Sequence, residues 1–476
     1  MTWEAVIGVE IHVQLKTGRK LFCGNRPVFG DPPNTHICPV CLGLPGALPV
    51  LDHSAVDLAV RTSLALGCEV HHESVWARKN YFYPDLPKGY QITQFDRPIA
   101  TNGSFTFEGP DGDVAVRIRR VHMEEDAGKS LHDRIAGATA VDLNRAGTPL
   151  VEIVTEPDLR DPADTRAFLT ALKHVLEYLD VSDCNMEEGS LRADANVSLR
   201  AVGSTALGTK TEIKNVNSFS GIERALVLEI ARQTDRLEAG DRVSQATLSW
   251  DDHRGELRLM RSKEESHDYR YFPEPDLPPL HVTEDQIVSA RAALPELPRA
   301  RKARFETTHH LPAYDSGVLT QTSATADYFE ALVKATSDPK AASNWIMGPL
   351  SALMNQRGED ALSVSVRPAA LAELIELVAD GTLSESAAKK LLLHLAEEGG
   401  SPRESAEARG LVQIRDADQL SRWVESALAE LGDEVHRYRA GETKLLGPMV
   451  GRVMQISGGA ADPRMVRQLL VERLEA

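Results

Sequence analysis

Residues 9–15 read VEIHVQL, and in this stretch apolar and polar side chains alternate without a break. Such a period of two is typical of a β-strand with one buried face and one polar face. The apolar positions are Val9, Ile11, Val13 and Leu15, and the polar positions are Glu10, His12 and Gln14. The pattern returns in LRADANVSLR at residues 191–200, and TPLVEIV at 148–154 is an apolar run interrupted by one acid. The sequence therefore predicts several strands with charged groups on their polar face.

The patterns along the chain predict an α+β protein in three parts. Asp161-Pro162 combines an N-cap residue with proline at the first helical position, and it predicts the start of a helix. A proline-rich segment at 271–280 predicts an extended linker, and helical patterns dominate after about residue 285. We expect a sheet-rich catalytic domain at 1–292, a helical domain at 293–402 and a helical tail at 403–476.

Composition narrows the class of protein. The 476 residues carry a net charge of −17, which argues against a protein that coats nucleic acid non-specifically, although a local basic patch is compatible with it. No stretch approaches 18 uninterrupted apolar residues, and the N-terminus lacks the pattern of a signal peptide. We expect a cytoplasmic protein whose five cysteines are reduced.

The segment VHMEEDAGKS at 121–130 ends like a phosphate-binding loop but is not one. A Walker A loop requires glycine five residues before the Gly-Lys pair, and Met123 occupies that position. The three acids before Gly128 would also repel phosphates unless a cation lay between them. We expect Gly128, Lys129 and Ser130 to form a turn.

Acids and a histidine recur on the predicted strands. Glu10 and His12 share one strand face, Glu152 and Asp194 lie on two other strands, and the HMEED acids end a fourth. If these strands are neighbours in one sheet, a shared Mg²⁺ would explain the cluster, because hard cations prefer oxygen ligands. The alternative is that each residue is an ordinary solvent-facing strand residue.

Three cysteines lie close together in the sequence. Cys23, Cys38 and Cys41 include a Cys-x-x-Cys pair, which is a usual half of a structural zinc site. His36 or Asn25 would have to supply the fourth ligand. The alternative is a set of three free or buried thiols.

The segment at 77–98 mixes cations with aromatic rings, as a nucleotide site does. The cations are Arg78, Lys79, Lys88 and Arg97, and the rings are Tyr81, Phe82, Tyr83 and Tyr90. The alternative is a tyrosine-rich packing loop under a sheet.

Eight motifs in order carry a resemblance to a known family. They are VIGVEIHVQL, CPVCLGLPGALPVL, ARKNYFYPDLPKGYQIT, HMEEDAGKS, VDLNRAGTPLVEIVTEPD, MEEGSLRADANVSLR, KNVNSFSGIERAL and DYRYFPEPDLPPL. Together they resemble the B subunits of aspartyl/glutamyl-tRNA(Asn/Gln) amidotransferases, the GatB family. Weaker similarity continues to the C-terminal MVGRVMQISGGAADPRMVRQLL.

The resemblance implies an ATP-dependent ligase. It implies that the side-chain carboxylate of Glu or Asp, misacylated on tRNA(Gln) or tRNA(Asn), is phosphorylated and then amidated. It also implies three kinds of partner: an amidase (the A subunit) that releases ammonia from glutamine, a small C subunit, and a non-discriminating aminoacyl-tRNA synthetase. The sequence contains no glutamine-cleaving pattern of its own, which agrees with an external ammonia source.

The resemblance also implies roles for individual residues. The implied Mg²⁺ ligands are Glu10, His12, Glu125, Glu152 and Asp194. The implied catalytic residues are Glu125, Lys79 and Glu10, and the implied nucleotide-binding residues are Lys79, Arg78, Lys88 and Arg192. Many family members have a fourth cysteine where this chain has Asn25, so Cys23, Cys38 and Cys41 would be a three-cysteine remnant of a structural zinc site.

The family fold implies an antiparallel-sheet cradle of the glutamine synthetase type, followed by all-α domains that bind tRNA. Residues 435–476 have seven basic and four acidic side chains, a local net charge of +3 that suits RNA. Two other functions compete with this one: a ligase acting on a free amino acid, and a non-enzymatic scaffold for an amidase and a tRNA.

Overall fold

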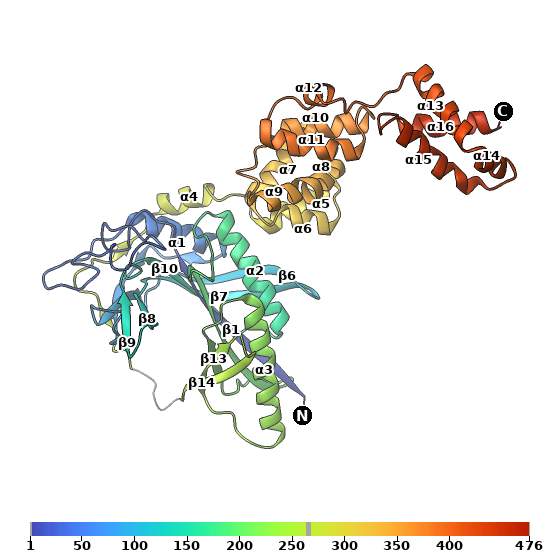
Figure 1. Ribbon diagram of the computed structural model, residues 1–476. Coiled ribbons are helices and arrows are strands. Elements are labelled where there is room, and N and C mark those ends of the chain that lie inside the picture. Colours follow the sequence, from blue (N-terminus) through green and yellow to red (C-terminus); the bar gives the residue numbers. More distant parts are fainter. Residues whose placement is uncertain (1, 263–267, 476) are drawn as a thin grey trace. The chain divides into compact units, whose positions relative to one another are not determined.

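The computed structural model describes residues 2–262 and 268–475, in two compact units, Met1–Arg299 and Ala300–Ala476 (Figure 1). The first unit combines sheets and helices, and the second is helical. The prediction of an α+β chain with a helical C-terminal region is confirmed. The division into three parts at 292 and 402 stays a prediction.

A nine-stranded sheet forms the first unit, in the order β14-β13-β12-β11-β1-β10-β7-β6-β2. Its strands are β1 (Trp3–Gln14), β2 (Glu69–Val70), β6 (Ala100–Gly109), β7 (Gly112–Glu125), β10 (Pro149–Thr155), β11 (Leu191–Ala201), β12 (Thr211–Lys214), β13 (Ala246–Asp251) and β14 (Glu256–Ser262). Neighbouring strands are antiparallel except for the parallel pair β12 and β13. The three stretches predicted as strands became β1, β10 and β11, because their alternation suits a sheet with one buried face.

Three helices pack on the apolar face of this sheet: α1 (His53–Ala65), α2 (Pro162–Tyr178) and α3 (Phe219–Glu238). The Asp161 side chain accepts a hydrogen bond from the backbone N–H of Ala163, so the predicted helix start is confirmed. Ile7, Ile11 and Val13 of β1 are fully buried in the core under these helices. The polar side chains of the same strands are thereby left on the opposite face.

Smaller sheets complete the unit: β15 (Phe272–Pro273) with β4 (Trp76–Asn80) and β5 (Tyr90–Gln94), β16 (Leu280–His281) with β3 (Glu73–Ser74), and β8 (Lys129–Ile135) with β9 (Ala138–Asp142). The proline-rich segment is therefore not a free linker. Its extended backbone pairs with β4 and β3, since proline is tolerated on edge strands. The predicted turn at 128–130 is also corrected, because Lys129 and Ser130 already belong to β8.

The second unit contains helices around two hydrophobic cores. The helices that follow α4 (Glu284–Ala292) are α5 (Pro298–His309), α6 (Ala313–Leu319), α7 (Ser323–Thr336), α8 (Pro339–Trp345), η2 (Ile346–Leu350), α9 (Ser351–Arg357), α10 (Pro368–Ala379), α11 (Glu385–Glu398), α12 (Pro402–Ala408), α13 (Ala417–Glu430), α14 (Gly432–Arg439), η3 (Thr443–Leu445), α15 (Leu446–Ile456) and α16 (Pro463–Glu475). One core includes Phe305 and Phe329, and the other includes Val424 and Met449. Across the described residues of both units, every helix is too short or too polar to cross a lipid bilayer.

Candidate active site

The polar face of the sheet carries a row of four charged or titratable side chains on four adjacent strands. Arg192 on β11 pairs with His12 on β1, His12 pairs with Glu152 on β10, and Glu152 pairs with His122 on β7. Directly opposed residues of antiparallel strands lie about 4.5–5.5 Å apart, so the register itself brings these side chains together. Strands from four separate segments between residues 3 and 201 thus build one site.

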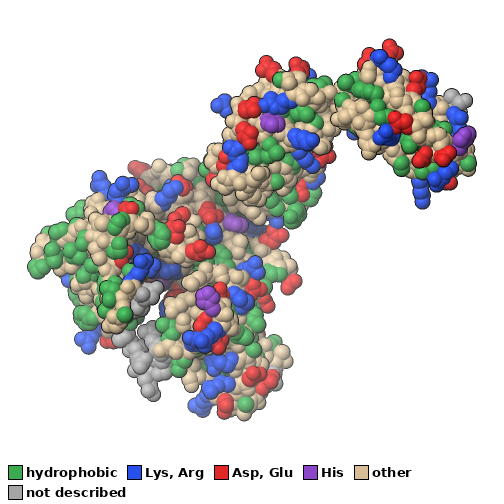
Figure 2. Space-filling view, in the orientation of Figure 1, with side chains coloured by type: hydrophobic (Ala, Val, Ile, Leu, Met, Phe, Trp, Pro, Cys, Tyr) green, Lys and Arg blue, Asp and Glu red, His purple; other side chains and the backbone are tan. Residues whose placement is uncertain are grey.

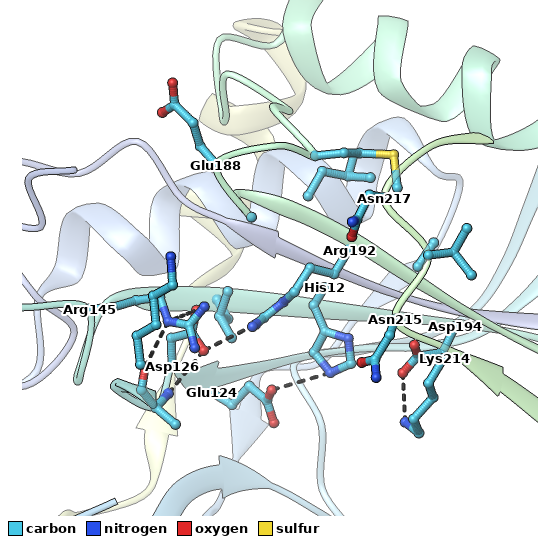
Figure 3. A pocket seen from close by; sticks show the side chains of 18 of the residues that line it. His12, Glu124, Asp126, Arg145, Glu188, Arg192, Asp194, Lys214, Asn215 and Asn217 are labelled. Carbon is cyan, nitrogen blue, oxygen red and sulfur yellow. Dashed lines mark hydrogen bonds and ion pairs between the residues drawn. The ribbon is translucent and has the colours of Figure 1, made fainter. Parts of the chain in front are cut away.

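Acids and histidines converge in the middle of this row, and Figure 3 shows one of these contacts, between His12 and Glu124. The His12 Nε2 atom lies 3.4 Å from Glu152 Oε2 and 3.6 Å from Glu124 Oε1. The His122 Nε2 atom lies 3.2 Å from the same Glu152 oxygen. One ligand atom each from His12, Glu124 and Glu152 lies within 4.8 Å of the other two. Two carboxylates and an imidazole at this spacing fit a divalent cation with mainly oxygen ligands.

The charges of this cluster depend on one another. Burial alone would raise the pKa of Glu152, but His122 and His12 outweigh it and hold that pKa well below its usual range. Burial likewise lowers the pKa of His12, yet its contact with Glu152 and the nearby Glu124 give a net increase. Within the cluster, the charged form of Glu152 and the protonated form of His12 therefore favour each other.

The sequence interpretation did not include His122 among the site residues. Its Nδ1 atom is buried without a hydrogen-bond partner among the described residues, while its Nε2 atom faces Glu152. The strand pattern could have identified His122, because His122 and Glu124 are two residues apart on one strand and must share a face.

Within the HMEED segment, the structure brings Glu124 rather than Glu125 to the histidines. Side chains alternate along β7, so Glu125 points away from the cluster. Glu125 forms a short ion pair with Lys88 and accepts a hydrogen bond from the backbone N–H of Ile92 at 2.9 Å. Lys88, which was predicted to bind nucleotide, is likewise occupied by this pair.

Glu10 and Asp194 form a second row beside the first. They are directly paired across β1 and β11. Lys214 of β12 lies 2.7 Å from Asp194 and compensates part of this negative charge. Burial, followed by the charge of Glu152, raises the pKa of Glu10. Both predicted acids therefore adjoin the cluster, and Lys214 is a cation that the sequence interpretation missed.

Cations gather at one end of the same cavity. Asp126 accepts a hydrogen bond from Arg192 at 3.1 Å and one from Gln14 at 2.8 Å, and it lies 3.6 Å from Arg145. Burial would raise the pKa of Asp126, but the two guanidinium groups lower it overall. The cavity has a volume of about 670 Å³, and its lining includes His12, Lys79, Glu124, Arg145, Arg192, Asp194 and Lys214. A polyphosphate could meet both cations and a metal site there.

The two remaining predicted nucleotide ligands differ in placement. Lys79 lines the cavity, with its ammonium 5.0 Å from the centre of the Tyr269 ring. Burial lowers the pKa of Lys79, but the charges of Glu124 and other acids raise it overall, so the side chain is a cation. Arg78 is instead held by Glu274 at 2.7 Å and stacks on Tyr90, which leaves it a structural role here.

The three predicted zinc ligands also come together. The Sγ atom of Cys41 lies 3.5 Å from that of Cys23 and 3.6 Å from that of Cys38. Asn25 approaches Cys41 with its Nδ2 atom at 3.5 Å, where a fourth thiol would complete a tetrahedral set. The ammonium of the buried Lys20 lies 3.6 Å from the same sulfur. Three thiols fit a zinc ion, and the fourth ligand would have to come from elsewhere.

The fold and the site together define a candidate catalytic domain: an antiparallel sheet, covered by helices on one face, that presents acids, histidines and cations in a cavity on the other. Residues 5–288 match the family described as the GatB/GatE catalytic domain, and residues 327–474 match the GatB domain.

Proteins named as the B subunit of an aspartyl/glutamyl-tRNA(Asn/Gln) amidotransferase are similar over the whole length. The protein from Moorella thermoacetica is 51% identical over 100% of both chains. The protein from Myxococcus xanthus is 49% identical over 99% of this chain and 98% of its own. The chain belongs to the GatB family and forms part of a tRNA-dependent amidotransferase.

Proposed function

We propose that this chain activates the side-chain carboxylate of Glu or Asp carried by tRNA(Gln) or tRNA(Asn), and then joins it to ammonia. ATP is the phosphoryl donor and ammonia comes from a partner amidase. The observation that carries the proposal is that His12 and Glu124, which form a cluster with Glu152, line one cavity together with Arg192 and Arg145.

The reaction requires two displacements. In the first, an oxygen of the substrate carboxylate attacks the γ-phosphorus of ATP, the bond to the β-phosphate oxygen breaks, and ADP leaves. In the second, ammonia attacks the acyl carbon, the bond to the phosphate oxygen breaks, and phosphate leaves as the nitrogen loses a proton. Phosphoryl transfer depends mainly on positioning and charge neutralisation, which this cavity is equipped to supply.

The acids and histidines of the site would bind the metal ion, and its cations would bind phosphate. His12, Glu124 and Glu152 would hold Mg²⁺, with His122 beside them, and the ion would neutralise phosphate charge. Arg192 and Arg145 would bind phosphate oxygens. Asp126 orients Arg192 through a hydrogen bond, and the backbone carbonyls of Ala127 and Gly128 orient Arg145. Lys79 contributes a further positive charge at the cavity wall.

Other features support an assembly of several different chains. Figure 2 shows hydrophobic side chains gathered over the N-terminal loops of the first unit, where the large exposed ones are Phe29, Leu44, Leu48 and Val50. Exposed apolar clusters of this kind commonly mark protein interfaces, and we assign this one to the amidase. We further propose that the sheet is a glutamine synthetase-type cradle, that the helical tail binds tRNA, that the small C subunit joins the assembly, and that the enzyme is cytoplasmic.

The test separates the two neighbouring acids of β7. The chain is reconstituted with its amidase and its small partner, and ADP release and amide on tRNA are measured separately with ATP, Mg²⁺, glutamine and Glu-tRNA(Gln) or Asp-tRNA(Asn). We expect Glu124→Gln to abolish tRNA-dependent ADP release while glutamine hydrolysis continues. Glu125→Gln, which alters the opposite side of the strand, retains ADP release. Equal ADP release by the wild type and Glu124→Gln would overturn the proposal.

A further inference from the structure

Five aromatic rings form a continuous series beside the cavity, and one of them, Tyr81, lines it. Tyr83 and Tyr81, Tyr81 and Tyr269, and Tyr269 and Tyr271 meet edge to face, with centroids 6.0, 6.0 and 6.2 Å apart and planes at 66°, 71° and 72°. Tyr271 and Phe95 then stack with centroids 4.0 Å apart and planes within 8° of parallel. We name this set, Tyr83, Tyr81, Tyr269, Tyr271 and Phe95, the aromatic ladder.

The small sheet β15-β4-β5 holds the ladder in place. Tyr81 and Tyr83 follow β4, Phe95 follows β5, and Tyr269 and Tyr271 precede β15. The backbone N–H of Asn80 donates to the carbonyl of Tyr269 at 2.9 Å. The rings are thus fixed by backbone pairing between segments that lie far apart in the sequence.

The ladder connects the cavity with solvent. Tyr81 lines the cavity together with Lys79, whose ammonium lies over the rings of both Tyr81 and Tyr269. The two ends are open, because Phe95 is 45% exposed and Tyr83 is 57% exposed. Tyr81 at the cavity is half-buried, and the exposed rings at the two ends offer faces on which further planar groups can stack.

We propose that the aromatic ladder binds the single-stranded 3′ end of the aminoacyl-tRNA by stacking its terminal bases. This inference rests on the proposed function. The amino acid is esterified to the terminal ribose, so a side-chain carboxylate inside the cavity places the terminal base at the cavity rim. Proteins bind single-stranded RNA by stacking bases on aromatic side chains beside cations, and the rim offers that combination in Lys79 and the ladder.

Stacking on the ladder would not depend on which bases the RNA end carries. Every base has a π face, so stacking positions an RNA end without reading its sequence. Phe95 and Tyr271 are then positioning residues, which act on where the ester lies and not on the phosphoryl transfer itself.

The test uses the full amidotransferase complex with Phe95→Ala, Phe95→Leu and the ring-retaining Phe95→Tyr. We expect the alanine and leucine variants to raise the KM for aminoacyl-tRNA by about fivefold to a hundredfold, while the KM for ATP and the kcat change little. Phe95→Tyr keeps the wild-type KM. The leucine variant retains apolar volume and so separates the loss of a planar ring from a loss of folding.

A spectroscopic probe reports stacking directly. An acceptor-stem minihelix with 2-aminopurine as its 3′-terminal base should lose fluorescence on binding to the wild-type complex and to Phe95→Tyr, but not on binding to Phe95→Ala. An unchanged KM for tRNA in Phe95→Ala, a change confined to the KM for ATP, or loss of the amidase from the variant complex would each overturn the proposal. A wild-type complex that quenches the probe but forms no amide would refute the proposed function and leave the ladder supported.

Discussion

The two faces of the central sheet are made by alternate residues of the same strands, and their roles differ. On β1, Ile11 is fully buried under the helices, whereas its neighbour His12 lies within 3.6 Å of two carboxylates in the open cavity. One face gains stability from apolar burial. The other gathers acids that repel one another and are only partly compensated by histidines and arginines. Adjacent residues of one strand should therefore affect stability and activity separately.

The largest expected effect is on the polar face. His12→Asn should reduce amide formation at least about a hundredfold, since even residues that only support metal ligands commonly cost 10–100-fold. The midpoint of thermal unfolding should change far less than it does when a core residue such as Ile11 is truncated. Rates and melting curves of the reconstituted complex measure both quantities.

The matched control for this variant is His253→Asn, which changes an exposed histidine of the same unit. It should leave both the rate and the melting midpoint unaltered. If the His12 and His253 variants lost activity equally, the polar face would not be the site.

The apolar face should respond in the opposite way. Ile11→Ala should lower the free energy of unfolding of the first unit by about 2–5 kcal/mol, and Ile11→Val by only about 0.5–1.5 kcal/mol. Activity per folded molecule at low temperature should remain. Denaturant titration monitored by tryptophan fluorescence gives the free energies. A loss of activity in the still-folded Ile11→Val protein would contradict the separation of the two faces.

The sequence predicts those features of the two faces that depend on neighbouring residues, and it does not predict those that depend on strand order. Alternation is local, so it identified β1, β10 and β11 and the polar sides on which Glu10, His12, Glu152 and Asp194 lie. It could also have chosen Glu124 over Glu125, because Val121 and Met123 are buried and Glu125 continues their side of β7. Once one face of a strand is assigned to the core, every second residue is assigned as well.

The order of strands is a different matter. The row Arg192, His12, Glu152 and His122 exists because β11, β1, β10 and β7 are neighbours, and tertiary packing decides that. Arg145 lies outside the strands, and Lys214 ends a four-residue strand, so neither shows a pattern that a sequence could reveal. The family resemblance predicted that these residues form one site. The pairing register of the strands shows which residues lie in it.

The cysteine cluster extends the comparison to ligands that a loop positions instead of a sheet. Cys23, Cys38 and Cys41 offer three thiols, and Asn25 stands where a fourth would complete the set. Asn25→Cys should therefore tighten zinc binding at least about tenfold, as measured by competition with a chromophoric chelator. Amide formation should stay within about twofold of wild type, because this cluster lies outside the cavity. Equal zinc affinity in the two proteins would mean that the loop cannot close around the ion.

The smallest expected effect is on the pH dependence of thermal stability, and it concerns only the polar face. Burial lowers the pKa of His12, but Glu152 and Glu124 outweigh it, so the folded-state pKa lies above the unfolded value. A raised pKa stabilises the fold fully below the unfolded value of about 6.5 and loses that contribution as pH rises through the folded value. Without divalent ions, wild-type protein should thus lose more thermal stability between pH 6 and pH 9 than His12→Asn. The lowered pKa of Glu152 does not disturb this window, since its contribution is lost only at acidic pH.

Added Mg²⁺ should reverse the trend, because a metal ion binds the neutral imidazole and competes with its proton. Melting midpoints are measured for both proteins across this pH range, with and without Mg²⁺. If the two midpoints shifted equally with pH under both conditions, His12 would not be coupled to the acids in solution.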